Sequence, residues 1–199
     1  MGINKAGIFN GHYGRTGGVV ARSVKGRVIL SIYQPNVTNP RTMLQMSNRN
    51  KFAALTEFLK PISMYLKYSF AAVGSQKSKN YFSSAVGYNC KVDGIYADTI
   101  NYKKIVLSVG NLVGLSDINV YKSDSSMRFS WSRDGGVYDD NVCVCVFDVL
   151  NKRYVYYLDY AKRGDGEMLI RTPDNVEKWV AWLSVNDGKG HWSTSQVVV

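Results

Sequence analysis

The sequence predicts an α+β protein in which a basic N-terminal arm, a β-hairpin and helices precede a seven-strand antiparallel β-sandwich. The first 18 residues contain six glycines, which is too many for a helix and typical of an extended arm. Apolar residues then recur at helical spacing, and from Ile105 they recur with a period of two. We therefore expect a glycine-rich basic arm and hairpin at 1–38, a helical segment at 39–104 and a sandwich domain at 105–199.

The N-terminal segment contains one candidate hairpin. The β-branched runs at 19–24 and 27–33 flank a Lys25-Gly26 turn, which predicts two paired strands. A two-strand hairpin alone is only marginally stable in water. The apolar residues of the preceding arm must also be shielded from water. They are Ile3, Ile8, Phe9 and Tyr13. We interpret residues 1–33 as an assembly arm that becomes ordered against a neighbouring subunit.

Helix signals follow the hairpin. Asn39-Pro40 combines a typical N-cap with a proline in the first turn, and the apolar spacing predicts a helix over roughly 40–59. Pro61 kinks this helix or opens a second one that reaches about residue 72. A short helix is expected over 80–90, with its first residue, an asparagine, as the cap.

Short runs of alternating apolar residues occupy the rest of the chain, separated by turns rich in Gly, Asn and Asp. This spacing is typical of a β-sandwich. The candidate strands are 105–109, 118–122, 127–132, 142–149, 153–160, 167–171 and 178–186, with a final stretch at 192–199. We expect this segment to fold alone, with Trp131, Trp179 and Trp182 inside it.

Aromatic residues gather in the strand expected at 153–160. Tyr154, Tyr156, Leu158 and Tyr160 share one face at a period of two. Two interpretations stay open for this face: packing within the protein, or a surface for a carbohydrate or a protein partner.

About the final 95 residues resemble a fibronectin type III domain in the order of their anchors. Met127–Trp131 resembles the second strand of that fold, whose tryptophan lies in the core. Leu169–Pro173 resembles the strand and corner before the next crossing. Val180–Gly188, followed by Ser193–Ser195, resembles the last hairpin. The resemblance implies an Ig-like sandwich and implies nothing about activity.

Charge is distributed unevenly along the chain, whose net charge is +10. Residues 1–104 hold 15 Lys/Arg and 3 Asp/Glu, whereas residues 105–199 hold 10 and 12. Seven basic residues lie in a stretch without acids: Arg15, Arg22, Lys25, Arg27, Arg41, Arg49 and Lys51. They either contact nucleic-acid phosphates without sequence preference, with Tyr13 and Tyr33 stacking on bases, or pack against acidic neighbours in an assembly.

Residue types that carry catalysis are sparse. His12 and His191 stand apart, and no Gly-x-Ser-x-Gly motif exposes a nucleophilic serine. Asp134, Asp139 and Asp140 surround a Gly-Gly turn, a pattern more typical of a solvated loop than of a Ca²⁺ site. The three cysteines lack metal-ligand spacing, and no phosphate-binding glycine motif is present. We predict no enzymatic activity, no cofactor and no metal.

The whole layout resembles a family of proteins from Bacteroidetes genomes and their phages. The resemblance is carried by the Gly-Ile-Asn-Lys-Ala-Gly-Ile-Phe-Asn-Gly segment at 2–11, the basic glycine hairpin at 14–33 and the helix at 39–52. The layout also resembles small virion proteins of crAss-like phages, such as the ring proteins stacked beneath the portal. These resemblances imply a virion component, assembled in the cytoplasm of the bacterial host. The alternative location is the bacterial cytoplasm.

We therefore expect a non-enzymatic structural subunit, a phage tail or neck ring protein that oligomerises through its N-terminal arm. Its expected partners are copies of itself and other virion proteins, with non-specific DNA contact. No apolar run approaches the length of a transmembrane helix, so no membrane is expected. The alternative function is a nucleic-acid-binding accessory protein that uses the basic N-terminal half.

Overall fold

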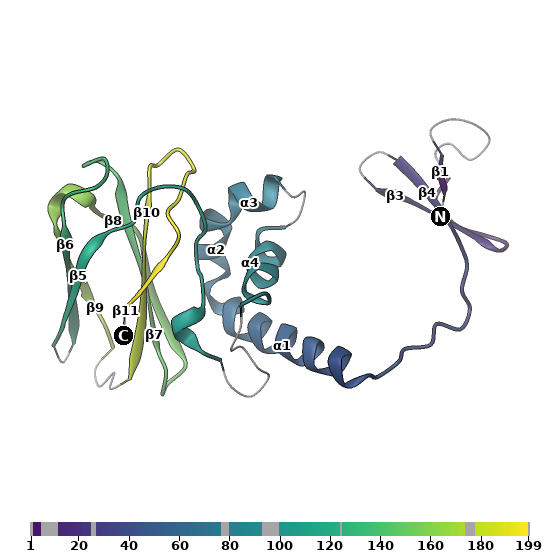
Figure 1. Cartoon of the computed structure of the whole chain (residues 1–199), viewed down its shortest axis with the longest axis horizontal. Coiled ribbons are helices and arrows are strands. Elements are labelled where there is room, and N and C mark those ends of the chain that lie inside the picture. The colour runs from purple at the N-terminus through teal and green to yellow at the C-terminus, as the bar shows by residue number, and fades with distance from the viewer. Residues whose placement is uncertain are drawn as a thin grey trace. The chain divides into compact units, whose positions relative to one another are not determined.

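The computed structural model describes residues 2–4, 12–24, 27–76, 80–92, 100–123, 125–173 and 178–198. The chain forms two compact units, Met1–Thr42 and Met43–Val199 (Figure 1). The three expected segments are thus grouped differently, because the helical residues belong to the same unit as the sandwich. Residue 105 is not a boundary between compact units.

The N-terminal unit is a four-stranded antiparallel sheet with the order β1-β4-β3-β2. Its strands are β1 (Gly2–Asn4), β2 (Gly14–Thr16), β3 (Val19–Val24) and β4 (Arg27–Ile32). Strands β3 and β4 form the hairpin expected from the sequence. The glycine-rich arm is expected to become ordered against a neighbouring subunit, whereas its two ends pair with the hairpin of the same chain as flanking strands. Gly17, with a φ of 57°, provides the tight turn that returns β2 onto β3.

Helices open the second compact unit, which we call the main unit. They are α1 (Met43–Leu59), the 3₁₀ turn η1 (Lys60–Ile62), α2 (Ser63–Ser69), α3 (Ala71–Gln76) and α4 (Tyr81–Asn89). The first helix begins three residues after Pro40, later than expected. Pro61 lies at the start of η1, where it separates α1 from α2. Asn80 caps α4 as expected, because its side chain accepts a hydrogen bond from the Phe82 backbone N–H at 3.0 Å.

Among the described residues, the sandwich of the main unit has seven strands. Six coincide with predicted strands, and the seventh lies within the final stretch predicted at 192–199. They are β5 (Ser116–Lys122), β6 (Ser126–Ser132), β7 (Asn141–Asp148), β8 (Arg153–Lys162), β9 (Glu167–Arg171), β10 (Trp179–Asn186) and β11 (Gln196–Val198). One sheet has the order β5-β6-β9 and the other the order β11-β10-β7-β8. Strands one, two and five of the sandwich therefore form one sheet, and strands three, four, six and seven form the other, as in an Ig-like β-sandwich of two packed antiparallel sheets.

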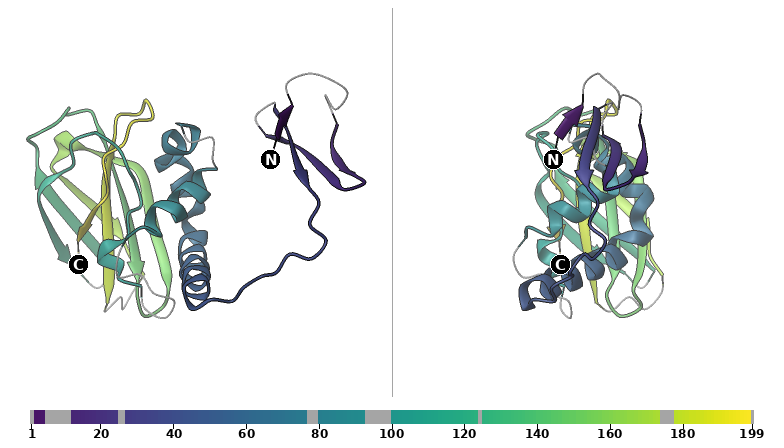
Figure 2. Two further views of the ribbon diagram at one scale, coloured as in Figure 1. Left: turned by 45° about the vertical axis from the view of Figure 1, so that its right-hand side comes forward. Right: turned by 90° about the vertical axis from the view of Figure 1, so that its right-hand side faces the viewer.

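The main unit has three layers because the helices cover the outer face of the four-stranded sheet (Figure 2). Strands β7 and β10 alternate between two cores. Their inner side chains, such as Val144 and Leu183, join Phe129 and Trp131 in the sandwich core. Their outer side chains join the helices in a second core, which we call the helix-side core. It includes Leu59, Tyr65, Phe147 and the fully buried Trp182.

The segment expected as a strand at 105–109 is irregular. Its side chains nevertheless alternate in burial as predicted, because Ile105 and Leu107 are fully buried in the helix-side core. Its backbone groups, however, bond to side chains instead of a neighbouring strand. The Asn89 amide donates to Val106 O at 2.9 Å and accepts from Val106 N at 2.8 Å. Trp182 Nε1 donates to Ile105 O at 2.8 Å. Side-chain partners replace the strand ladder here.

The tyrosine face expected on β8 is split by a bulge. Tyr154, Tyr156 and Leu158 pack against the helix-side core. Asp159 then adopts a left-handed φ of 52°, and the β7–β8 register shifts nearby. Tyr160 is consequently exposed, and the centroid of its ring lies 5.0 Å from the ring centroid of Tyr157. Packing explains three of the four side chains, and the bulge explains the fourth.

Candidate functional site

The two faces of the N-terminal sheet differ in chemistry. Residues directly opposite each other in an antiparallel pair share a face, and alternate residues on one strand share a face. Arg15 lies opposite Val20, Arg22 opposite Ile29, and Arg27 opposite Val24. One face therefore carries all three arginines, each of them exposed, together with the apolar residues Val20, Val24 and Ile29. We call this surface the basic face.

Arg15 is held in place on the basic face. Its guanidinium carbon lies 3.6 Å from the ring centroid of Tyr33, a cation–π contact. Its Nε donates to Gly17 O at 3.1 Å. Arg22 and Arg27 have no hydrogen-bond or ion-pair partner within the described part of the chain. Two of the three guanidinium groups are thus available to an external ligand.

The opposite face of the same sheet is apolar, and we call it the apolar face. Its apolar members are Val19, Ala21, Val28, Leu30 and Ile32, and Thr16 and Ser23 lie on the same face. Ala21 and Val28 are buried, but Ile32 is 82% exposed. A side chain of this size in water marks a surface that is suited to contact with a partner.

Three of the other predicted contact residues belong to the linker or to the main unit. Arg41 lies in the linker, and Arg49 and Lys51 lie on α1 of the main unit. The Lys51 ammonium donates to Val92 O at 3.0 Å and so has a structural partner. Tyr13 is described and is exposed. Lys25, Ile8 and Phe9, together with the Ile3 side chain, lie outside the described residues.

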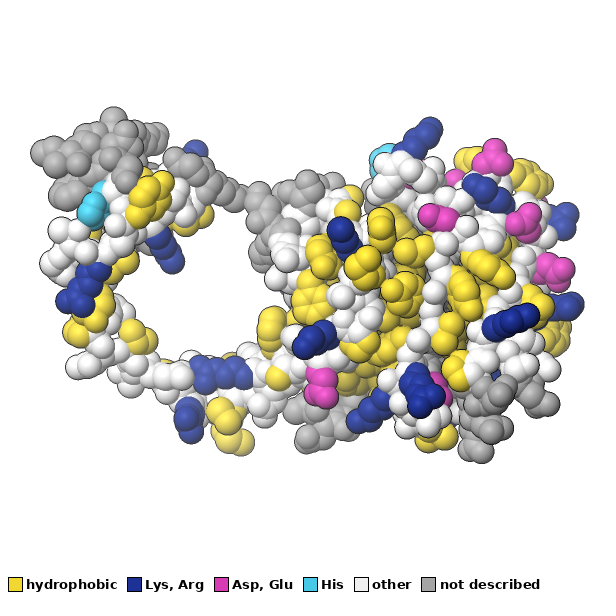
Figure 3. All heavy atoms as spheres, turned by 180° about the vertical axis from the view of Figure 1, so that it is seen from behind, with side chains coloured by type: hydrophobic (Ala, Val, Ile, Leu, Met, Phe, Trp, Pro, Cys, Tyr) yellow, Lys and Arg dark blue, Asp and Glu magenta, His cyan; other side chains and the backbone are white. Residues whose placement is uncertain are grey.

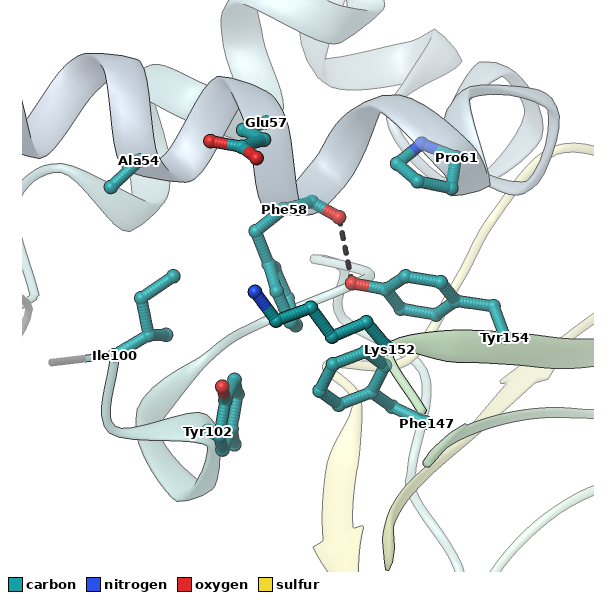
Figure 4. Close-up of a pocket in the computed structure, with 9 residues that line it drawn as sticks. All are labelled: Ala54, Glu57, Phe58, Pro61, Ile100, Tyr102, Phe147, Lys152 and Tyr154. Atoms are coloured by element: carbon teal, nitrogen blue, oxygen red, sulfur yellow. Dashed lines mark hydrogen bonds between the residues drawn. The ribbon is translucent and has the colours of Figure 1, made fainter. Parts of the chain in front are cut away.

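The main unit contains an aromatic pocket that sequence reasoning missed (Figure 4). Its volume is about 370 Å³, and it is lined by Ala54, Glu57, Phe58, Pro61, Ile100, Tyr102, Phe147, Lys152 and Tyr154. Phe58 contacts both Tyr102 and Phe147, with ring centroids 5.4 and 5.1 Å apart. Tyr154 Oη donates to Phe58 O at 2.7 Å. These residues come from distant parts of the chain, so no local pattern signals the pocket. Its rings chiefly pack on one another.

The buried thiols of β7 are poor nucleophiles. Burial raises the pKa of Cys143 to about 12, and burial also raises the pKa of Cys145. A thiol with a raised pKa is protonated at neutral pH, and the thiolate is the reactive form. Cys143 lies 3.2 Å from Asn186 Nδ2, which also donates to the Asp159 carboxylate at 2.6 Å. These contacts secure the β8 bulge.

Acidic and histidine side chains also have local partners. His191 Nδ1 lies 2.5 Å from the Asp187 carboxylate, and the hydrogen bond from His191 lowers the pKa of Asp187 to about 2. Asp140, expected in a solvated turn, is buried, with its carboxylate 3.7 Å from Nε of the fully buried Arg163. Arg163 Nη1 donates to Gly114 O at 2.9 Å, so Arg163 anchors the loops around it.

Among the described residues, no group of His, Cys, Asp or Glu could hold a metal ion.

The fold and its surfaces define an α+β protein with an Ig-like β-sandwich and a separate, two-faced N-terminal sheet. The chain belongs to a family of unknown function (DUF6266), which matches residues 11–188. Comparison with curated proteins found no match. No helix among the described residues is long and apolar enough to cross a membrane.

Two solved structures resemble part of the chain. A structure described as a myokine is 11% identical and covers 44% of this chain and 94% of its own, with a TM-score of 0.34. A DUF3244 family protein from Bacteroides vulgatus has an immunoglobulin-like β-sandwich fold. It is 14% identical and covers 45% of this chain and 96% of its own, with a TM-score of 0.25. The likenesses concern less than half of this chain, and no argument about function rests on them.

Proposed function

We propose that this protein is a structural subunit that assembles with copies of itself, and that the apolar face of its N-terminal sheet makes the contact. A ring in a phage tail or neck is the setting that the sequence resemblance suggests. The observation that carries the proposal is the incomplete cover of the apolar face, on which Val19 is 40% exposed and Ile32 is 82% exposed. Sheets normally bury such a face against another layer.

A second uncovered apolar surface lies at the start of α1 in the main unit. Met43 is 90% exposed, and Leu44 is 72% exposed. Leu44 is in helical register with the buried Leu55 and Leu59, so it extends the core-facing stripe beyond the core. We propose that the apolar face of one copy covers this helix start in the next copy. Helix on sheet is a standard way to bury both surfaces.

Charge favours this head-to-tail contact over the pairing of two N-terminal units. Residues 1–42 hold six Lys/Arg and no acid, so two such units repel each other. Residues 43–199 hold 19 Lys/Arg and 15 Asp/Glu and carry a far lower charge density. A head-to-tail contact uses two different surfaces and closes into a ring when the rotation between copies permits. The three-layer main unit supplies the rigid body of each subunit.

The test is the native mass of the full chain by light scattering and native mass spectrometry. We expect an oligomer that Ile32→Ser and Leu44→Ser each dissociate, while unfolding of the main unit stays unchanged. Val37→Ser is the matched control, because Val37 is an equally exposed apolar residue in the linker. A full chain that stays monomeric at all concentrations contradicts the proposal, since the sheet then packs within its own chain or stays free. So does an Ile32→Ser variant that keeps the oligomeric mass.

A further inference from the structure

The arginines of the basic face lie on a diagonal across three neighbouring strands. Residues directly opposite one another on neighbouring strands form a row across the sheet. Arg15 on β2 lies in the row of Val20 on β3, and Arg22 lies two residues further along β3, in the next row on the same face. The next row on that face contains Arg27 on β4, opposite Val24. Each step moves one strand across and two residues along. Neighbouring Cα atoms are therefore about 8 Å apart, and the row is about 16 Å long.

This geometry suits an extended polyanion. Three guanidinium groups in a line meet successive charges along a chain, whereas a site for one small anion needs donors that converge. Guanidinium groups also bind phosphate oxygens in a planar, bidentate manner. No carboxylate in residues 1–56 offsets the charge. In the space-filling view, Lys and Arg but no Asp or Glu side chains are visible on this unit (Figure 3).

We propose that the basic face binds the phosphate backbone of nucleic acid, without sequence preference, through Arg15, Arg22 and Arg27. The cation–π contact with Tyr33 pre-positions Arg15, while Arg22 and Arg27 have no competing partner in the described part of the chain. The opposite, apolar face remains free for the protein contact proposed above. A subunit can therefore contact another copy and a nucleic acid at the same time.

The experiment measures binding of a fluorescein-labelled DNA duplex of about 12 mixed-sequence base pairs by anisotropy over a range of salt concentrations. Three phosphate contacts predict a slope of roughly −3 in a plot of log affinity against log salt. Arg22→Gln combined with Arg27→Gln removes two contacts. The slope then falls by about 2 units and the affinity by at least roughly tenfold at low salt.

The matched control is Arg41→Gln combined with Lys60→Gln, which removes the same charge from exposed positions that are not part of the N-terminal sheet. It is expected to leave the slope nearly unchanged. Equal losses in the two double variants would show attraction by overall charge alone and overturn the proposal. So would no binding by the full chain, or equal competition by polyglutamate of the same charge, which would assign the face to an acidic protein. Ile32→Ser keeps the binding, so this proposal and the assembly proposal fail independently.

Discussion

Each compact unit contains a four-stranded sheet, and the two sheets are covered very differently. In the main unit, β7 and β10 are buried on both faces, by the second sheet on one side and by the helices on the other. In the N-terminal unit, β3 and β4 leave arginines exposed on one face and Ile32 exposed on the other. The central strands of the main unit are thus covered on both faces, whereas the N-terminal sheet leaves side chains exposed on both of its faces. The alternation of side chains along a strand therefore does not reveal whether other layers cover one face of its sheet or both.

Composition explains part of the contrast. Residues 142–147 of β7 read Val-Cys-Val-Cys-Val-Phe, a continuous apolar run typical of a strand buried on both faces. Strand β3 reads Val-Val-Ala-Arg-Ser-Val, which mixes apolar and charged positions. The first strand needs two covering layers, whereas the second needs one layer and keeps a charged face outside.

The largest expected effect concerns the helix layer. A fragment of residues 43–199 is expected to unfold cooperatively at the same urea midpoint as the main unit of the full chain. A fragment of residues 105–199 is expected to lose cooperative unfolding, because the outer side chains Cys145, Phe147 and Trp182 lose their cover. Tryptophan fluorescence in urea measures both. An unchanged urea midpoint for the fragment of residues 105–199 would show that the sandwich folds alone, as the sequence predicts.

A smaller effect is expected at the hydrogen bond between α2 and β10. Tyr65 Oη lies 2.6 Å from Ser184 Oγ, and both residues are fully buried. Tyr65→Phe leaves the serine hydroxyl without this partner and should lower the free energy of unfolding by about 1–3 kcal/mol. Tyr68→Phe is the control on the same helix, because Tyr68 is exposed. Equal urea midpoints for the two variants would show that this bond does not join the layers.

The smallest effect is on reactivity and leaves stability unchanged. Cys90 is only half-buried, whereas Cys143 and Cys145 lie beneath the helix layer with pKa values raised by burial. A thiol reagent at neutral pH should label Cys90 first, and the two β7 thiols more than about 100-fold more slowly. Cys90→Ser should abolish the fast phase. Rapid labelling of all three thiols in the native protein would mean that the helix layer opens readily.

Local patterns in the sequence determined the fold class, the positions of β5 to β10, the hairpin of the N-terminal unit and the Asn80 cap. These features depend on residues that are close in the chain, through strand alternation, turn residues and capping geometry. The same is true of the concentration of positive charge in the first half. The arginines at 15, 22 and 27 form a basic stretch in the sequence itself, whatever the pairing of the strands.

Tertiary structure alone decided which surfaces were covered. Residues 105–109 alternate like a strand, but Asn89 and Trp182, from distant parts of the chain, take their backbone hydrogen bonds. The register of β2, β3 and β4 placed three arginines on one diagonal and left Arg41, Arg49 and Lys51 elsewhere. The helices became a layer of the main unit because the outer face of the four-stranded sheet is apolar and must be buried. Periodicity depends on residues that are neighbours in the chain, whereas the burial of a surface depends on elements that are far apart in the chain.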